Sequence, residues 1–214
     1  MLKTGPGNRP NFLEKASAFP SLYPIVYPMS IGFKEWTLVC NALGKGSQSL
    51  ILRKGGIAEG RAGFSFKHDE FLLFPTLFHE QTRHLKLPPE TPLPAPSQEI
   101  TVHFLAKVLW AREFSDLSAI QRLAPFHLWT DALVEERFRY DNRLSLNIAL
   151  VRVFKLSHPL TFPDSPQYGG CRSWVSLPDP ESHLVPVLSD AEHLARTAQI
   201  EAALGSPPFP HDRP

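Results

Sequence analysis

Apolar and polar residues alternate along several segments of the chain, and a period of two is typical of β-strands. The most regular alternation covers residues 100–110, where every second side chain is apolar. A nearly continuous apolar run at 146–154 predicts a long central strand. Shorter runs at 49–53 and 70–74 predict further strands, the second ending at Pro75. We therefore expect a mixed or antiparallel sheet.

Helical periodicity occupies other parts of the chain. Between Phe33 and Leu43 the apolar residues recur at i, i+3, i+6, i+7 and i+10, which places them on one helical face. Gly44 offers a natural C-terminal stop for this helix. Further helices are predicted from Thr76 to Lys86, after a cap at Asp116, over 131–139, and over 189–204 with Ser189 or Asp190 as cap. Together with the strands, they predict an α+β fold with helices flanking the sheet.

Proline-rich stretches suggest the domain organisation. Residues 1–30 hold five prolines and predict a poorly ordered extension. Residues 88–98 hold five more and predict a stiff connector between the two halves of a domain spanning 31–177. Residues 178–214 then add a C-terminal helix and tail. The second half, with a strand, helices and a long returning strand, is compatible with a PUA-like barrel.

The composition indicates a soluble protein of the cytoplasm. Of the 214 residues 43% are hydrophobic, enough for a sizeable core, and no run of about 18 or more apolar residues predicts a transmembrane helix. The proline-rich start argues against a signal peptide, so we expect Cys40 and Cys171 to be reduced thiols. Met29 directly precedes the first patterned segment and is an alternative start to Met1.

The charge distribution argues against a dedicated DNA-binding domain. The net charge is only +1. Residues 31–86 hold eight Lys and Arg against five Asp and Glu, whereas residues 164–214 hold three against seven. A strong sequence-independent phosphate binder would be more basic, although folding can still gather a local basic patch.

The densest candidate site is the segment from Arg53 to Gln81. Arg53 and Lys54 precede Gly55 and Gly56, and this combination can present basic side chains and backbone N–H groups to a phosphate or carboxylate. The structural alternative is a solvated hairpin tip. No GxxxxGK[ST] pattern follows the strand, which excludes a P-loop, and no glutamate-rich helix follows that would support a Nudix hydrolase.

Potential metal ligands lie in the same segment: His68, Asp69, Glu70, His79 and His84. If the strand ending near Phe74 packs against the helix after it, His68 and His79 can approach each other. The spacing of His79 and His84 fits no compact zinc motif. Histidines that cap a strand or bond a loop are the structural alternative, and the sequence does not identify a metal or cofactor.

A divalent-ion nuclease of the PD-(D/E)XK type needs carboxylates at strand ends and a lysine. Glu59, Asp69, Glu70 and Lys67 are the candidates, but Lys67 precedes the carboxylates Asp69 and Glu70 instead of following them. The pattern is therefore incomplete.

Two features outside this segment also carry chemistry. Arg172 can lower the pKa of the Cys171 thiol and favour a nucleophile, whereas a structural cysteine after a glycine turn is the alternative. Trp129 and Arg137 can form an aromatic and basic ligand face, or a core residue and the wet side of a helix.

Several motifs carry a family resemblance. They are Phe33-Lys34-Glu35-Trp36, the Leu52–Ile57 stretch with Glu59, the Phe71–Thr76 stretch with His79 and Gln81, Arg137-Phe138, the strand with Leu150–Val153, and the Tyr168–Trp174 stretch. Over roughly 31–177 they resemble the prokaryotic domain-of-unknown-function 1802 family. The resemblance implies no assigned activity. Some relatives are associated with a restriction-endonuclease-like domain, which implies a link to restriction or DNA processing.

The first functional hypothesis is a nucleic-acid-associated binding or accessory protein. Arg53, Lys54 and Lys67 would contact phosphates, and the aromatic surface near Trp129 would contact a base.

Two alternatives remain open from the sequence. One is a metal-dependent hydrolase that uses His68, Glu70 and His79 with Glu59. The other is an interaction module without chemistry, in which the Arg53–Gln81 segment is only the structural centre of the fold. The sequence leaves open whether the protein is an enzyme, and also its oligomeric state.

Overall fold

The structure, a computed structural model, describes residues 29–54, 64–77 and 81–205. Its elements are β1 (Met29–Trp36), α1 (Thr37–Gly44), β2 (Leu50–Arg53), β3 (Glu70–Thr76), α2 (Gln81–His84), β4 (Glu99–Phe114), α3 (Leu117–Arg122), α4 (Asp131–Arg139), β5 (Leu146–Pro163), β6 (Trp174–Pro178), β7 (Leu184–Pro186) and α5 (Asp190–Leu204), with 3-10 turns η2 (Ala124–Phe126), η3 (Tyr140–Asn142) and η4 (Pro166–Tyr168). Within these ranges, no helix has the length and apolar character needed to span a membrane.

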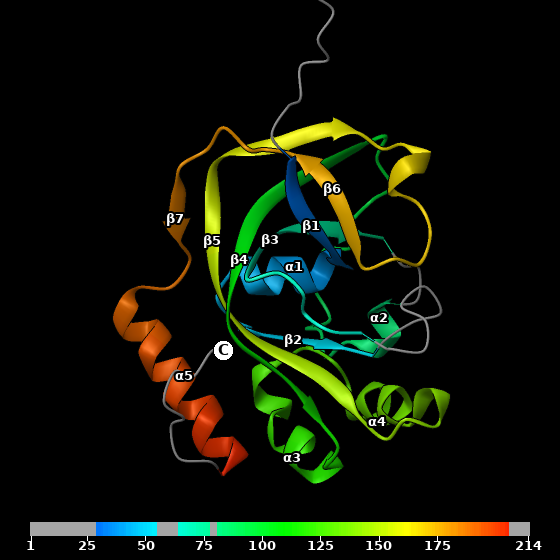
Figure 1. Ribbon diagram of the computed structural model, residues 1–214, viewed down its shortest axis with the longest axis vertical. Helices are drawn as coiled ribbons and strands as arrows, with labels where there is room; N and C mark the ends of the chain where they lie inside the picture. Colours follow the sequence, from blue (N-terminus) through cyan, green and yellow to red (C-terminus); the bar gives the residue numbers. More distant parts are fainter. Residues whose placement is uncertain (1–28, 55–63, 78–80, 206–214) are drawn as a thin grey trace, which may run out of the picture.

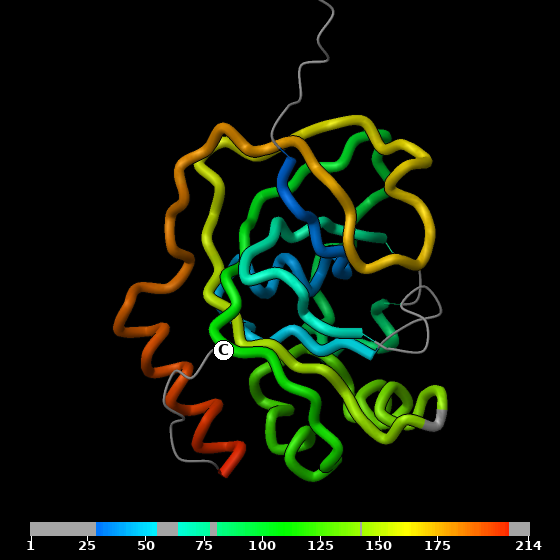
Figure 2. Tube along the Cα trace, in the orientation of Figure 1, coloured from blue at the N-terminus to red at the C-terminus, as the bar shows by residue number. Residues whose placement is uncertain are grey.

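The strands form one sheet in the order β2-β5-β4-β3-β1-β6, and β7 pairs with β5. β1 and β3 are parallel, and the other pairs are antiparallel. Strands from both sides of the proline-rich connector therefore share this sheet. The sheet curls around α1, which contacts β1, β3, β4 and β5 (Figure 1). The start of the described chain at β1 runs beside β6, near the other end of the sequence (Figure 2).

The two faces of the curled sheet carry separate apolar clusters. Side chains alternate across a strand, so Phe71 and Leu73 of β3 join the large cluster around α1, whereas Leu72 and Phe74 join a smaller cluster on the other face. The smaller cluster also includes Tyr168 from the loop after β5. This loop therefore packs on the face of the sheet that is opposite α1.

Two of the predicted helices are shorter than expected. Residues from Phe33 to Trp36 form the end of β1, and the helix begins only at Thr37. The helix expected from Thr76 is reduced, in the described part, to the single turn of α2, because β3 continues through Pro75. The β3–β4 ladder ends at Leu72, so the missing N–H of Pro75 interrupts no bond to β4.

Other predictions are confirmed. The Asp116 side chain accepts a hydrogen bond from the Ser118 amide at the start of α3. Ser189 and Glu192 form a reciprocal capping box at α5. The strand expected at 100–110 lies within β4, and the α+β class with a mixed sheet and flanking helices is also confirmed.

Candidate functional site

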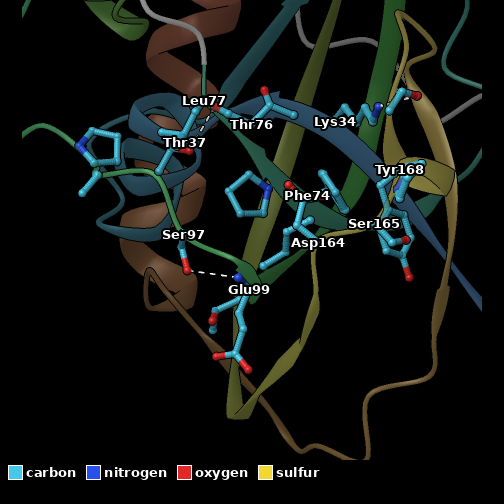
Figure 3. A pocket seen from close by; sticks show the side chains of 17 residues that line it. Lys34, Thr37, Phe74, Thr76, Leu77, Ser97, Glu99, Asp164, Ser165 and Tyr168 are labelled. Atoms are coloured by element: carbon cyan, nitrogen blue, oxygen red, sulfur yellow. Dashed lines mark hydrogen bonds between the residues drawn. The ribbon is translucent and has the colours of Figure 1, made fainter.

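An open pocket of about 690 Å³ lies on the sheet face that carries the smaller apolar cluster. Its walls come from the ends of β1 and β3, the connector near Ser97, the start of β4 and the loop 164–169 (Figure 3). The polar lining residues are Lys34, Thr37, Thr76, Ser97, Glu99, Thr101, Asp164 and Ser165. The volume is in the usual range for a small-molecule site, roughly 300–1,000 Å³.

Lys34 is the charged residue that the fold buries in this wall. Strand alternation sends its side chain away from Phe33, onto the face with Phe74, and leaves the residue only 8% exposed. Its Nζ donates to the carbonyl oxygens of Gly169 at 3.3 Å and Gly170 at 3.1 Å. An ammonium group has three donors, so one remains for a ligand among the described contacts.

The pKa of Lys34 lies below its ordinary value. Burial is the main cause, because it penalises the charged form. The positive charges of Arg172 and Arg53 also lower the pKa, while Cys171 and Asp164 oppose the shift. Charges of both signs therefore act on Lys34, and burial is the main cause of its lowered pKa.

One loop joins these cations. Arg53, at the end of β2, donates from Nη2 to Oγ of Ser173 at 3.2 Å, and its guanidinium lies 5.1 Å from the centre of the Phe33 ring. Arg172, one residue earlier in the loop, is exposed and donates to the carbonyl oxygen of Gln167. We call Lys34, Arg53 and Arg172 the cation cluster. The loop thus contacts Lys34 and Arg53 from different directions, because Arg53 lies against Phe33 and its charge acts on Glu35, whereas the Lys34 side chain points to the other face of β1.

The loop 164–169 adds acidic and hydroxyl groups to the pocket wall. Asp164 is exposed, and its amide donates to the carbonyl oxygen of Gln98 at 2.8 Å, which ties the loop to the connector. Oγ of the adjacent Ser165 is buried and has no hydrogen-bond partner among the described residues. The charged groups of the pocket wall are therefore the Lys34 ammonium and the carboxylates of Glu99 and Asp164.

Lys54, a predicted phosphate ligand, is committed to the protein itself. Its Nζ donates to the carbonyl oxygens of Phe138, Arg143 and Ser145 and forms an ion pair with Asp141. The side chain is 5% exposed. This geometry assigns Lys54 to anchoring the segment between α4 and β5.

The other described residues of the predicted site do not come together in one place. His68 is half-buried, with its ring edge against Trp174 at a centroid distance of 4.8 Å. Glu70 forms an ion pair with Lys107, and Lys67 is exposed. In the described ranges no three His, Cys, Asp or Glu side chains converge on a metal-sized site. The remaining predicted residues, Gly55, Gly56, Glu59 and His79, lie outside the described residues.

Two further sequence alternatives can be compared with the structure. Trp129 is 5% exposed within the main core, which confirms the core alternative and not the aromatic ligand face around it. Cys40 and Cys171 are free cysteines, the first buried and the second exposed.

The sequence reasoning named Lys34 and Glu35 only as part of a family motif, and it predicted none of Lys34, Glu35, Asp164 and Ser165 as site residues. Glu35 is buried on the sheet face opposite Lys34, and burial raises the pKa of its carboxyl, although the Arg53 charge and a hydrogen bond from the Trp36 amide partly counteract this. The signal that could have identified Lys34 and Glu35 is a pair of adjacent charged residues in a strand, which places one side chain on each face of the sheet. It was hidden because the segment was predicted to be helical.

The fold and pocket define the protein as an α+β domain with a curled mixed sheet and a pocket beside the buried Lys34 on one face. The chain belongs to the family described as "Domain of unknown function (DUF1802)", whose sequence profile matches residues 32–199. The family resemblance is thereby confirmed. No match was found among curated proteins.

Two solved structures resemble the chain. A crystal structure of a mutant ZmASCH protein from Zymomonas mobilis has 11% sequence identity and a TM-score of 0.40, with 78% of this chain and 94% of that chain covered. A crystal structure of ASCH from Zymomonas mobilis has 12% identity and a TM-score of 0.39, covering 78% and 92%.

Proposed function

We propose that this protein binds nucleic acid, with a phosphate group held by the cation cluster and part of the adjacent nucleotide in the Lys34 pocket. The observation that carries the proposal is the gathering of Lys34, Arg53 and Arg172 around residues 169–173. The positive charges of Arg172 and Arg53 disfavour the charged form of Lys34, and a phosphate would offset them while accepting charge-assisted hydrogen bonds.

Half-buried aromatic rings next to the cluster support the same ligand. Trp174 directly follows Ser173, the residue that Arg53 contacts, and it packs against His68 and Phe33. The exposed Lys67 lies beside His68 in the chain. Partly exposed aromatic rings beside cations are a usual surface for single-stranded nucleic acid, because a base can stack on a ring face while its phosphate is neutralised. Compared with the nucleic-acid surface predicted from the sequence, the proposed surface keeps Arg53 and Lys67, adds His68 and Trp174, and leaves out Lys54 and Trp129.

The binding test uses a fluorescently labelled single strand of twelve nucleotides, measured by anisotropy at 50 and 200 mM salt. Both RNA and DNA are used, since the family resemblance implies a link to DNA processing. We expect affinity to fall as salt rises, and each phosphate contact contributes about 0.7 to the slope of log K against log salt. No detectable binding of either strand at 50 mM salt would remove the proposal.

Matched variants locate the surface. Lys34→Met and Arg172→Met should each weaken binding by roughly fivefold or more and reduce the salt slope, because each removes one charge from the phosphate site. Lys155→Met is the control, since Lys155 is an exposed lysine of β5 that pairs with β7 and does not line the pocket. Equal losses in all three variants would contradict the assignment to the cation cluster.

A further inference from the structure

We infer that His193 makes the attachment of α5 sensitive to pH, because protonation of its imidazole releases the helix from β5. The inference goes beyond the proposed function and does not depend on it. Its starting point is the way in which α5 is held: of the 15 residues in this helix, only His193 and Ile200 are buried. One of the two buried side chains of α5 therefore belongs to the residue type that titrates near neutral pH.

The first half of α5 is attached mainly through polar groups. Asp190 forms an ion pair with Arg152 of β5, and Arg196 donates from Nη1 to the carbonyl oxygen of Ser47 at 3.4 Å. The apolar packing of the helix against the main core comes from residues 200–204. Exposed ion pairs contribute little to stability, so this part of the helix can open while the sheet stays folded.

His193 lies in the interface between this half of the helix and β5. The residue is 6% exposed, and its Nε2 atom is buried without a hydrogen-bond partner among the described residues. A neutral imidazole needs no donor hydrogen on Nε2, whereas an imidazolium carries a hydrogen on both ring nitrogens. Protonation therefore turns Nε2 into a buried charged donor without an acceptor, which is costly in a folded protein.

Arg152 adds a second charge of the same sign. Its side chain lines a small cavity together with His193 and pairs with Asp190, which lies one turn earlier on α5. Arg152 and Asp190 are the charged groups that act on His193 within the described ranges. The other residues that line the cavity are uncharged; they come from α1, the turn after it, β5 and the segment before α5. A protonated His193 would thus lie beside the guanidinium, and the nearby carboxylate already pairs with Arg152.

The direction of the pH effect follows from this environment. The pKa of His193 lies below its ordinary 6.5, mainly because of burial and also because of the Arg152 charge, although Asp190 partly counteracts the shift. Above pH 6.5 the imidazole is neutral in both the attached and the released helix, so pH has no effect. Below pH 6.5 the released form binds a proton more readily, and release should become easier by up to about tenfold per pH unit.

Hydrogen exchange followed by mass spectrometry tests the inference on the full chain. Peptides from α5 are compared with peptides from β4 and β5 at pH 7.0 and 5.5, after each rate is corrected for the intrinsic pH dependence of exchange. We expect protection of α5 to fall by about threefold to tenfold more than protection of the strands. An equal fall in helix and strands would overturn the inference, because a global process would then account for it.

A titration of the imidazole signals by NMR provides a measurement on the unmodified protein. The pKa of His193 should lie below 6.5, in contrast to the exposed His183. A His193 value at or above 6.5 would contradict the inference whatever the exchange data show.

Variants assign the effect to the side chain. His193→Gln keeps a polar group that does not titrate in this range, so protection of α5 should become independent of pH between 7.0 and 5.5. His183→Gln is the control and should show the full fall. A fall that persists in His193→Gln would overturn the inference. If α5 of this variant already lacks protection at pH 7.0, Arg152→Met decides: removal of the neighbouring cation should reduce the fall, and an undiminished fall contradicts the inference.

Discussion

The Nζ atom of Lys54 lies 3.3 Å from Oδ1 of Asp141 and donates to the carbonyl oxygen of Ser145 at 3.0 Å. Asp141 has a positive φ of 59° inside η3, a conformation that is uncommon for residues other than glycine. The lysine therefore fixes a tight turn between α4 and β5 from the end of β2. This contact is a structural anchor at a position where the sequence suggested a ligand site.

Replacement of Lys54 by Met should lower the free energy of unfolding by about 2–3 kcal/mol, because three carbonyl groups and a carboxylate lose their common partner. Chemical denaturation measures the change. Lys45→Met, at an exposed position, should change it by less than about 0.5 kcal/mol. Nucleic-acid affinity of the folded Lys54→Met protein should stay within twofold of the unmodified protein. A larger loss in affinity with intact stability would return Lys54 to the binding surface.

Gly170 and Gly205 provide a matched pair for the loop. Both have positive φ, 79° and 71°, and an added Cβ would meet no atom within 4 Å in either case. Alanine should therefore destabilise the protein by about 1 kcal/mol at each position. Of these two glycines, Gly170 but not Gly205 supplies a carbonyl oxygen to Lys34. Gly170→Ala should therefore weaken oligonucleotide binding, and Gly205→Ala should not. Equal binding by both variants would show that the local path of this loop does not control the cation cluster.

His127 should make the fold sensitive to acid. Burial, with a smaller contribution from the Lys86 charge, lowers its pKa to about 3 from the ordinary 6.5. At a pH between these two pKa values, His127 therefore binds a proton in the unfolded chain but not in the folded protein. Stability should be unaffected above pH 6.5 and fall as pH decreases towards 3, by up to about 1.4 kcal/mol per pH unit from this residue.

The replacement His127→Phe removes this titrating group, so it should flatten the pH dependence of the melting temperature between about pH 6.5 and 4. The exposed His183 is the control site, and His183→Phe should leave the slope unchanged. An unaltered slope in the His127→Phe protein would show that other groups account for acid sensitivity.

Gly44 ends α1 against the ring of Phe104, and a Cβ at this position would overlap the ring atoms. Gly44→Ala should destabilise the protein by about 1–3 kcal/mol, because Phe104 must leave its place. Phe104→Leu in the same chain should recover part of that loss, which a double-mutant cycle measures. Strict additivity of the two changes would contradict direct contact as the cause.

Local signals account for the elements that were predicted correctly. The capping box of Ser189 and Glu192 and the cap at Asp116 involve residues within three positions of one another, so their geometry follows from a short window of sequence. The alternation at 100–110 persists over many residues and predicted the core of β4. Only the ends of such elements, where β4 extends to Phe114, depended on pairing with β5.

By contrast, the spacing of Phe33 and Trp36 is compatible with both a helical face and a strand. Pairing with β3 and β6 decided in favour of β1, and both partners lie far along the chain. This choice also determined the site. In a strand, Lys34 and Glu35 face opposite sides of the sheet, and Lys34 reaches the loop at 169–170.

The sequence by itself determined the α+β class, the caps, the strand core at 100–110 and the family, because these depend on local propensity, periodicity and short motifs. Only the tertiary structure decided which basic residues are available to a ligand. Lys54 is enclosed by carbonyl groups, whereas Lys34, Arg53 and Arg172 gather around one loop. The physical reason is that hydrogen bonding and burial of a charged side chain depend on groups brought together by long-range strand pairing, and the sequence around that side chain does not contain this information.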